Sequence, residues 1–207
     1  MKEGRWQMIK NVVFDIGNVL VDYRLKEFLA EKGFDGLMIK RIIKASIMSP
    51  YWETFERADI TETEALKSFA GLDPEIEEEL NKAYENVHGM LTIRDFAVEW
   101  IRSLKEDGYQ TYYLSNYSKK AYEECADSLA FMEYMDGGLL SFQARKTKPN
   151  PLFYKEFLDK YDLKAEECVF IDDTEENVLE ARKLGFQGIV YESYEKTVEQ
   201  LEKLLAK

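Results

Sequence analysis

Short runs of apolar residues end abruptly at polar or charged side chains at several points along the chain. The clearest runs cover residues 12–15, 111–115, 169–172 and 188–191, and residues 139–142 form a weaker one. β-Branched and aromatic residues are frequent in these runs, as is typical of strands. Because the runs are almost continuously apolar, they predict buried strands of a sheet that is covered on both faces.

Between these strand candidates, apolar residues recur at helical spacing. The predicted helices cover residues 92–106, 119–128, 151–160, 175–184 and 194–205. Alternation of strands and helices is typical of an α/β protein with a doubly wound parallel sheet. In such a sheet, ligands bind at the edge formed by the carboxyl ends of the strands.

The segment from residue 23 to residue 91 interrupts this alternation, because it shows helical patterns and no convincing strand. The patterns cover residues 25–31, 37–48, 51–57, 61–69 and 74–86. A crossover between parallel strands needs only about a dozen residues, so we interpret the segment as an inserted helical cap. The predicted division is a core of residues 1–22 and 92–207 and a helical cap of residues 23–91.

Composition and charge mainly exclude classes of partner. The chain has 207 residues, of which 45% are hydrophobic, which is enough for a substantial core. A net charge of −12 disfavours binding to nucleic acid or to an anionic membrane. The two cysteines, Cys125 and Cys168, predict neither a disulfide framework nor a zinc site. No apolar run approaches the ~20 residues of a membrane span, and we expect a cytoplasmic protein.

Polar side chains with chemical potential lie where predicted strands end. Asp15 ends the first strand, and Ser115 followed by Asn116 ends the second. Asp172 and Asp173 end another strand as two adjacent carboxylates. Because parallel strands bring their carboxyl ends to one edge, we expect these side chains to meet there.

Such a group of carboxylates favours Mg²⁺, which commonly retains waters and binds one substrate phosphate oxygen. Lys148, just before a proline-led helix start, supplies a positive point charge for an anion. With the metal and the lysine offsetting its charge, Asp15 could attack phosphorus and form an aspartyl-phosphate. The residues therefore indicate phosphoryl transfer.

Four segments in this order resemble the motifs of the haloacid dehalogenase-like (HAD) hydrolase superfamily. They cover residues 14–19, 114–116, 148–149 and 171–177. The resemblance implies a Rossmann-like core with a helical cap inserted after the first strand. The Asp-x-Gly-Asn pattern of the first motif is similar to that of a helical-cap phosphatase branch that includes the glucose-1-phosphate phosphatases.

The resemblance also implies roles for the matching residues that handle the phosphoryl group. Asp15 is expected to be the nucleophile, and Lys148 to bridge it to the phosphoryl group, so these two residues form the expected catalytic pair. Ser115 and Asn116, together with Lys148, are expected to bind the transferred group.

For the metal, the resemblance implies Mg²⁺ held by Asp15, the backbone carbonyl of Gly17 and Asp173. Asp172 is expected in or near the coordination shell. Asn177 is expected to orient the acidic loop.

Gly17 departs from the common family pattern, which has a second aspartate as general acid and base at this position. The only histidine, His88, lies at the expected end of the cap, so a metal-bound or ordered water, or Asp22 folding back, is left to give and take the proton. Residues 51–57 include Trp52 and Glu56, but aromatic residues at helical spacing are more typical of a packed helix face. The sequence therefore assigns these two residues no role.

The leading hypothesis is a Mg²⁺-dependent phosphatase of a small phosphorylated metabolite, with sugar phosphates among the candidates. Two alternatives stay open: a 2-haloacid dehalogenase-type hydrolase without a metal, and a catalytically retired scaffold that acts as a binding or regulatory protein. We expect a monomer or a weak homodimer.

Overall fold

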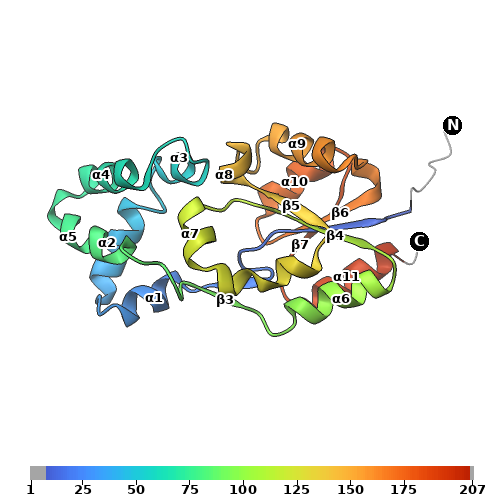
Figure 1. Cartoon of the computed structure of the whole chain (residues 1–207), viewed down its shortest axis with the longest axis horizontal. Helices are drawn as coiled ribbons and strands as arrows, with labels where there is room; N and C mark the ends of the chain where they lie inside the picture. The colour runs from blue at the N-terminus through green and yellow to red at the C-terminus, as the bar shows by residue number, and fades with distance from the viewer. Residues whose placement is uncertain (1–7, 206–207) are drawn as a thin grey trace.

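The computed structural model describes residues 8–205 and has a five-stranded parallel sheet at its centre (Figure 1). The strand order is β5-β4-β1-β6-β7. The strands are β1 (Asn11–Phe14), β4 (Gln110–Ser115), β5 (Gly137–Leu140), β6 (Cys168–Asp172) and β7 (Gln187–Val190). The predicted doubly wound parallel sheet is therefore confirmed. Residues 1–7, which the prediction assigned to the core, lie outside the described residues.

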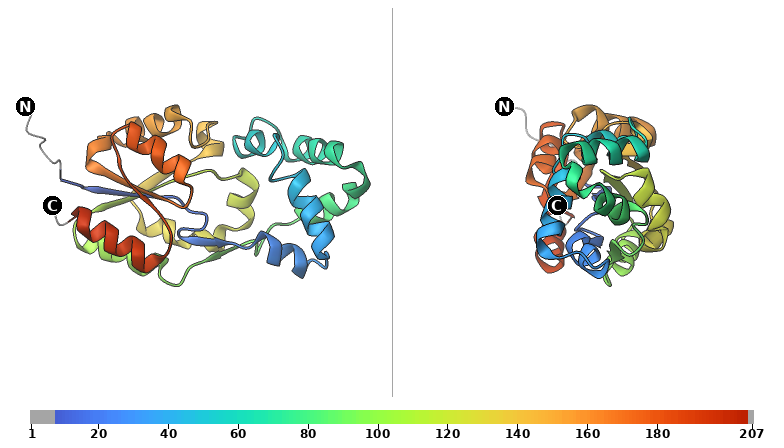
Figure 2. Two further views of the ribbon diagram at one scale, coloured as in Figure 1. Left: turned by 180° about the vertical axis from the view of Figure 1, so that it is seen from behind. Right: turned by 90° about the vertical axis from the view of Figure 1, so that its left-hand side faces the viewer.

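Helices cover both faces of this sheet (Figures 1 and 2). One face is covered by α9 (Pro151–Tyr161) and α10 (Glu175–Lys183), and the other by α6 (Ala97–Glu106) and α11 (Tyr194–Leu205). None of the helices within residues 8–205 has the length and apolarity that a membrane span requires.

The central strand β1 shows why its sequence is continuously apolar. Val13 packs with Phe153 and Phe157 of α9 on one face. Phe14 packs on the other face against Trp100 of α6, with ring centroids 4.8 Å apart. Since successive strand residues point to opposite faces, a strand buried on both sides needs apolar residues at every position.

A group of helices lies beyond the carboxyl edge of the sheet, as Figure 1 shows on its left side. It consists of α1 (Leu25–Glu31), α2 (Gly36–Ala45), α3 (Trp52–Glu56), α4 (Glu62–Leu72), η1 (Pro74–Ile76) and α5 (Glu77–Tyr84). We call these residues, 25–84, the helical segment. The start of α4 has a capping box in which Thr61 Oγ1 accepts from the Glu64 N–H and the Glu64 carboxylate accepts from the Thr61 N–H.

Two short strands flank the helical segment, and the expectation of no strand between residues 23 and 91 was wrong at both ends. β2 (Val21–Tyr23) and β3 (Leu91–Ile93) pair antiparallel, with Tyr23 opposite Leu91. Three residues are too few to show a period of two, so the pattern was not visible in the sequence. The predicted division of the chain cuts through this ribbon and stays a prediction.

Three further predicted elements end or begin elsewhere. β5 ends at Leu140, and the next residues form the short helix α8 (Ser141–Ala144) instead of continuing the strand. α6 begins at Ala97, because residues 91–93 belong to β3. The predicted helix 119–128 consists of α7 (Lys119–Glu124) followed by the 3₁₀ helix η2 (Ala126–Tyr134).

Candidate active site

Asp15 follows β1 at the carboxyl edge of the sheet, between the ends of β4 and β6. Its N–H donates to the Ile171 carbonyl at 2.8 Å, which continues the pairing with β6. The chain then turns sharply, and the residue with left-handed backbone is Asn18, at φ 56°, rather than Gly17. Asparagine tolerates this conformation better than most residues. The turn therefore leaves the Asp15 carboxylate, 8% exposed, facing the edge.

Lys148 joins two of the expected site carboxylates. Its Nζ lies 2.8 Å from Asp15 Oδ1 and 2.6 Å from Asp172 Oδ2, and the residue is only 5% exposed. Asn116 fixes the backbone at this position: its Oδ1 accepts from the Lys148 N–H at 2.8 Å, and its Nδ2 donates to the Lys148 carbonyl at 3.1 Å. The ammonium group is thus held beside Asp15 by its backbone and by its charge.

Asp172 is fully buried, and donors from the protein occupy both of its oxygens. Besides Lys148, the Thr174 N–H donates to Oδ1 at 2.8 Å, and Asn177 Nδ2 lies 3.1 Å from both oxygens. Asn177 therefore contacts the acidic loop through the Asp172 carboxylate, and its expected role in orienting that loop stays a prediction. With these partners, Asp172 mainly anchors Lys148.

The protonation states follow from burial and from these charges. Burial raises the pKa of Asp15 to about 6, with Asp172 adding to the rise and Lys148 opposing it. Burial alone would lower the pKa of Lys148, but Asp15 and Asp172 outweigh it and raise that pKa above its usual value. At neutral pH the pair is therefore a carboxylate beside an ammonium group.

The acidic side chains at this edge fit a divalent cation. Asp15, Asp172 and Asp173 each offer a carboxylate oxygen, and these oxygens lie within 4.8 Å of one another. Asp173 is half-buried and accepts from Asn18 Nδ2 at 3.0 Å, so its carboxylate is more accessible than that of Asp172. A cluster of hard oxygen donors suits Mg²⁺.

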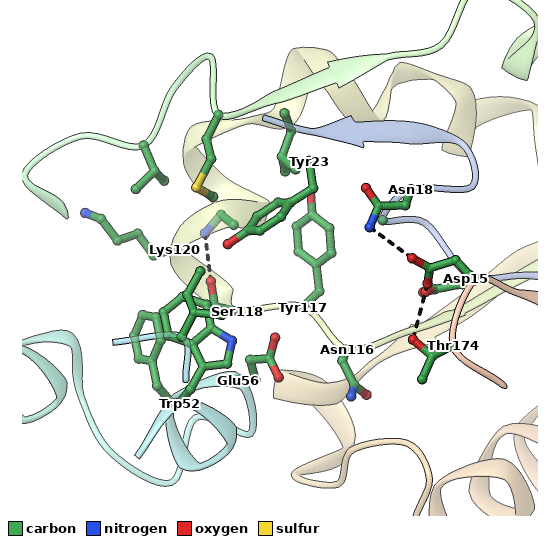
Figure 3. A pocket seen from close by; sticks show the side chains of 18 of the residues that line it. Asp15, Asn18, Tyr23, Trp52, Glu56, Asn116, Tyr117, Ser118, Lys120 and Thr174 are labelled. Atoms are coloured by element: carbon green, nitrogen blue, oxygen red, sulfur yellow. Dashed lines mark hydrogen bonds between the residues drawn. The ribbon is translucent and has the colours of Figure 1, made fainter. Parts of the chain in front are cut away.

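A pocket of about 270 Å³ opens at this edge, between the sheet and the helical segment (Figure 3). Asp15, Gly17, Asn116 and Asp173 lie in its wall. Most of the remaining wall is apolar or aromatic, formed by Tyr23, Ile47, Trp52, Phe55, Tyr84, Val87, Met90, Leu91, Tyr117 and Ala121.

The other expected site residues lie behind this wall. Ser115 is 1% exposed; its hydroxyl donates to the Asn116 carbonyl at 3.5 Å, and its side chain contributes to lowering the pKa of Asp15. Lys148, Asp172 and Asn177 are also buried and support Asp15 from below the pocket floor. The structure therefore brings all eight expected residues together, but in two layers.

Sequence reasoning assigned no role to two residues that line the pocket, Trp52 and Glu56. Both lie on α3, which approaches the sheet only in the folded chain, so no local signal marks them. Burial raises the pKa of Glu56 to about 7.

Asp22, the side chain expected as a stand-in for the missing acid, lies elsewhere, and so does His88. Asp22 accepts from Arg94 Nε at 2.8 Å, and its side chain is exposed. His88 is also exposed, with Nδ1 3.2 Å from the Glu124 carbonyl. Neither residue lines the pocket.

The sequence of the whole chain also resembles known proteins. Residues 9–185 match the haloacid dehalogenase-like hydrolase family, and the chain belongs to that family. Its sequence is 26% identical over 198 residues to flavin mononucleotide hydrolase 1 of Arabidopsis thaliana, covering 93% of this chain and 76% of that protein. It is 27% identical over 183 residues to the sesquiterpene phosphatase astK of Aspergillus oryzae, covering 87% of this chain and 88% of that protein.

Among solved structures, a HAD family enzyme from Bacteroides thetaiotaomicron, in complex with magnesium and inorganic phosphate, superposes with a TM-score of 0.67. The sequences are 21% identical, and the match covers 91% of this chain and 98% of the other. This similarity shows a shared fold.

Proposed function

We propose that this hydrolase is a Mg²⁺-dependent phosphatase that cleaves the phosphate monoester of a small metabolite through an aspartyl-phosphate on Asp15. One observation carries the proposal. The Lys148 ammonium lies between Asp15 and Asp172, with Asp173 alongside, so that one nucleophilic carboxylate faces the pocket beside a cation and a candidate metal site. Both curated relatives named above are called hydrolases or phosphatases of phosphorylated compounds, which supports this reading.

In this proposal, Lys148 favours the charged form of Asp15, and the buried residues around the pair hold it in place. The Asp15 carboxylate attacks phosphorus, and Lys148 offsets negative charge on the phosphoryl oxygens. Asn116 fixes the Lys148 backbone and also faces the pocket, where its amide can contact the phosphoryl group. Ser115, buried beside Asp15, lowers the pKa of the nucleophile and so favours its charged form.

Asp15, Asp173 and the Gly17 carbonyl would hold Mg²⁺, while Asp172 anchors Lys148. The metal supplies positive charge that stabilises the phosphoryl oxygens during transfer. A protein of the same fold was crystallised with magnesium and inorganic phosphate, which supports this choice of cation.

We further propose that the helical segment is the cap of this site. Tyr23, Trp52 and Glu56 reach the pocket from β2 and α3, opposite the sheet edge that carries Asp15. A cover of this kind excludes bulk water from the reacting groups.

A panel of phosphate monoesters, assayed with Mg²⁺ and with excess EDTA, tests the proposal. We expect turnover only with Mg²⁺. Compact aromatic or aliphatic esters should have a kcat/KM at least about tenfold above that of hexose phosphates, because each sugar hydroxyl left unpaired against an apolar wall costs about 1–3 kcal/mol. The wall around Trp52, Phe55 and Met90 is the physical reason.

Each alternative predicts a different result when 2-haloacids are added to the panel. Turnover of 2-haloacids that persists in EDTA would support the dehalogenase reading. No turnover of any ester, together with no stabilisation of the fold by beryllofluoride and Mg²⁺, would support a retired scaffold. A preference for hexose phosphates would refute the expected match between the apolar wall and the substrate.

A further inference from the structure

The pocket lacks an acid at the position where the family pattern has one. Gly17 lines the pocket without a side chain, and a Cβ built there meets no other heavy atom within 4 Å. The alkoxide that leaves phosphorus needs a proton, and the water that follows must lose one. Some other group in the pocket wall must exchange these protons.

The tyrosines of the wall do not fit this task. Burial raises the pKa of Tyr23, Tyr84 and Tyr117 well above the usual value of a phenol. The Tyr84 hydroxyl also donates to Ser46 Oγ at 2.8 Å. A phenol with a raised pKa transfers its proton poorly at neutral pH.

The charged groups Lys120 and Asp173 are engaged elsewhere. Lys120 Nζ lies 2.8 Å from Glu62 and 2.7 Å from Glu124, and these partners raise its pKa. Asp173 accepts from Asn18 and belongs to the candidate metal cluster. Of the titratable groups that line the described pocket, Glu56 remains besides the nucleophile.

Glu56 is held in place by contacts of α3 with α8 and with the loop that follows α8. Ser141 Oγ donates to the Glu56 carbonyl at 2.8 Å, and Thr147 Oγ1 donates to Glu53 Oε1 at 2.6 Å. Thr147 is the neighbour of Lys148, so α3 is fastened beside the phosphoryl site. Figure 3 shows the Glu56 carboxyl group between Trp52 and Asn116, within the pocket.

We propose that Glu56 is the general acid and base of this phosphatase. The Asp15 carboxylate attacks phosphorus, the bond from phosphorus to the ester oxygen breaks, and Glu56 gives its proton to that oxygen to form the free alcohol. Water then attacks phosphorus and gives a proton to Glu56, and the bond to Asp15 breaks. Phosphate leaves, and both carboxyl groups return to their starting states. The inference rests on the proposed function.

The surroundings of Glu56 suit both halves of this cycle. Burial raises its pKa to about 7; Trp52 and then Lys148 oppose this rise, and Asp15 and Glu53 add to it. Tyr23 is also close enough to Glu56 for the Glu56 charge to contribute to the raised pKa of Tyr23. The protonated form prevails below this pKa and is lost above it, so kcat/KM for esters with poor leaving groups should fall as pH rises through about 7.

The test compares two esters in the Glu56→Gln variant. An alkyl phosphate needs the acid because its alkoxide is a poor leaving group, whereas p-nitrophenolate leaves without help. We expect kcat/KM to fall about 100-fold or more for the alkyl ester and less than about threefold for p-nitrophenyl phosphate. The basic limb of the alkyl-ester pH profile should disappear.

A second readout follows the covalent enzyme directly. Without a base for water, Glu56→Gln should release a burst of p-nitrophenol and accumulate phosphate on Asp15, detected by mass spectrometry after an acid quench. Glu53→Gln is the matched control, because it removes one charge from the same helix and keeps an oxygen for Thr147. It should change kcat/KM of both esters by the same factor and show no burst.

Equal losses on both esters in Glu56→Gln, with the pH profile unchanged and no phosphoenzyme accumulating, would overturn the role of Glu56 and leave the phosphatase proposal intact. If the wild-type enzyme hydrolyses neither ester with Mg²⁺ present, the proposed function fails, and the role of Glu56 fails with it.

Discussion

Replacing Asp15 with asparagine should lower kcat/KM for phosphate esters by about 10⁴-fold or more, because the amide is not a nucleophile and the reaction has no other route to the covalent intermediate. The fold should persist, since Lys148 keeps its 2.6 Å contact with Asp172. Steady-state kinetics with Mg²⁺ measures the loss, and thermal unfolding checks that the variant is folded.

The matched control is Asp22→Asn, which makes the same change on an exposed residue of β2. Asp22 does not line the pocket, and its partner is Arg94. Its turnover should stay within about threefold of the wild type, as is usual for surface substitutions. Full turnover in Asp15→Asn would show that the nucleophile has been misassigned.

Replacing Lys148 with methionine should abolish turnover and also lower the free energy of unfolding by about 3–5 kcal/mol, because it leaves two buried carboxylates without their cation. Lys146→Met, two residues earlier, is the control. Lys146 pairs with Glu156 at 2.7 Å, but both side chains are partly exposed. Its loss should cost less than about 1 kcal/mol. Urea unfolding measures both values.

The pH dependence of the free energy of unfolding distinguishes the loss of the cation from a simple loss of packing. Without Lys148, burial and repulsion by Asp172 hold the folded pKa of Asp15 further above its unfolded value. The folded variant then binds more protons than the unfolded chain, so its stability falls as pH rises. The deficit of Lys148→Met should therefore be smaller near about pH 5 than near about pH 8. An equal loss of stability at both pH values would show that the changed shape of the side chain, rather than its lost charge, causes the loss.

The buried sheet and the gathering of the acidic edge could be predicted from the sequence, because both follow from local patterns and a general rule of topology. Each strand around Asp15, Ser115 and Asp172 is marked by its own apolar run. The parallel arrangement then determines which ends meet. No contact between distant residues had to be known for this prediction.

The two-layer arrangement could not be predicted. The sequence places Asp172 and Asp173 next to each other, yet Asp172 is fully buried and bound to Lys148 while Asp173 faces the pocket. Which carboxylate points inward depends on the pleat of β6 and on the position of α10. Similarly, β2 and β3 are recognisable as strands only by pairing with each other across the helical segment.

The pocket wall was the least predictable part. Trp52 and Glu56 line the same pocket as Asp15 because α3 is fastened to Ser141 and Thr147, about 85 to 94 residues later in the chain. A helix of five residues has too short a pattern to show which face will meet a ligand. The rule that aromatic residues at helical spacing belong to a core was therefore incomplete here, since Trp52 stacks on Phe69 and also lines the pocket.

The covalent intermediate is the central claim, and one measurement tests it most directly. The wild-type enzyme is mixed with Mg²⁺ and p-nitrophenyl phosphate, quenched in acid during turnover, and digested for mass spectrometry of the peptide that contains Asp15. We predict phosphate on Asp15 in the wild type and none in Asp15→Asn or in excess EDTA. Sustained turnover in which phosphate is carried by another residue, or by none, would contradict the account.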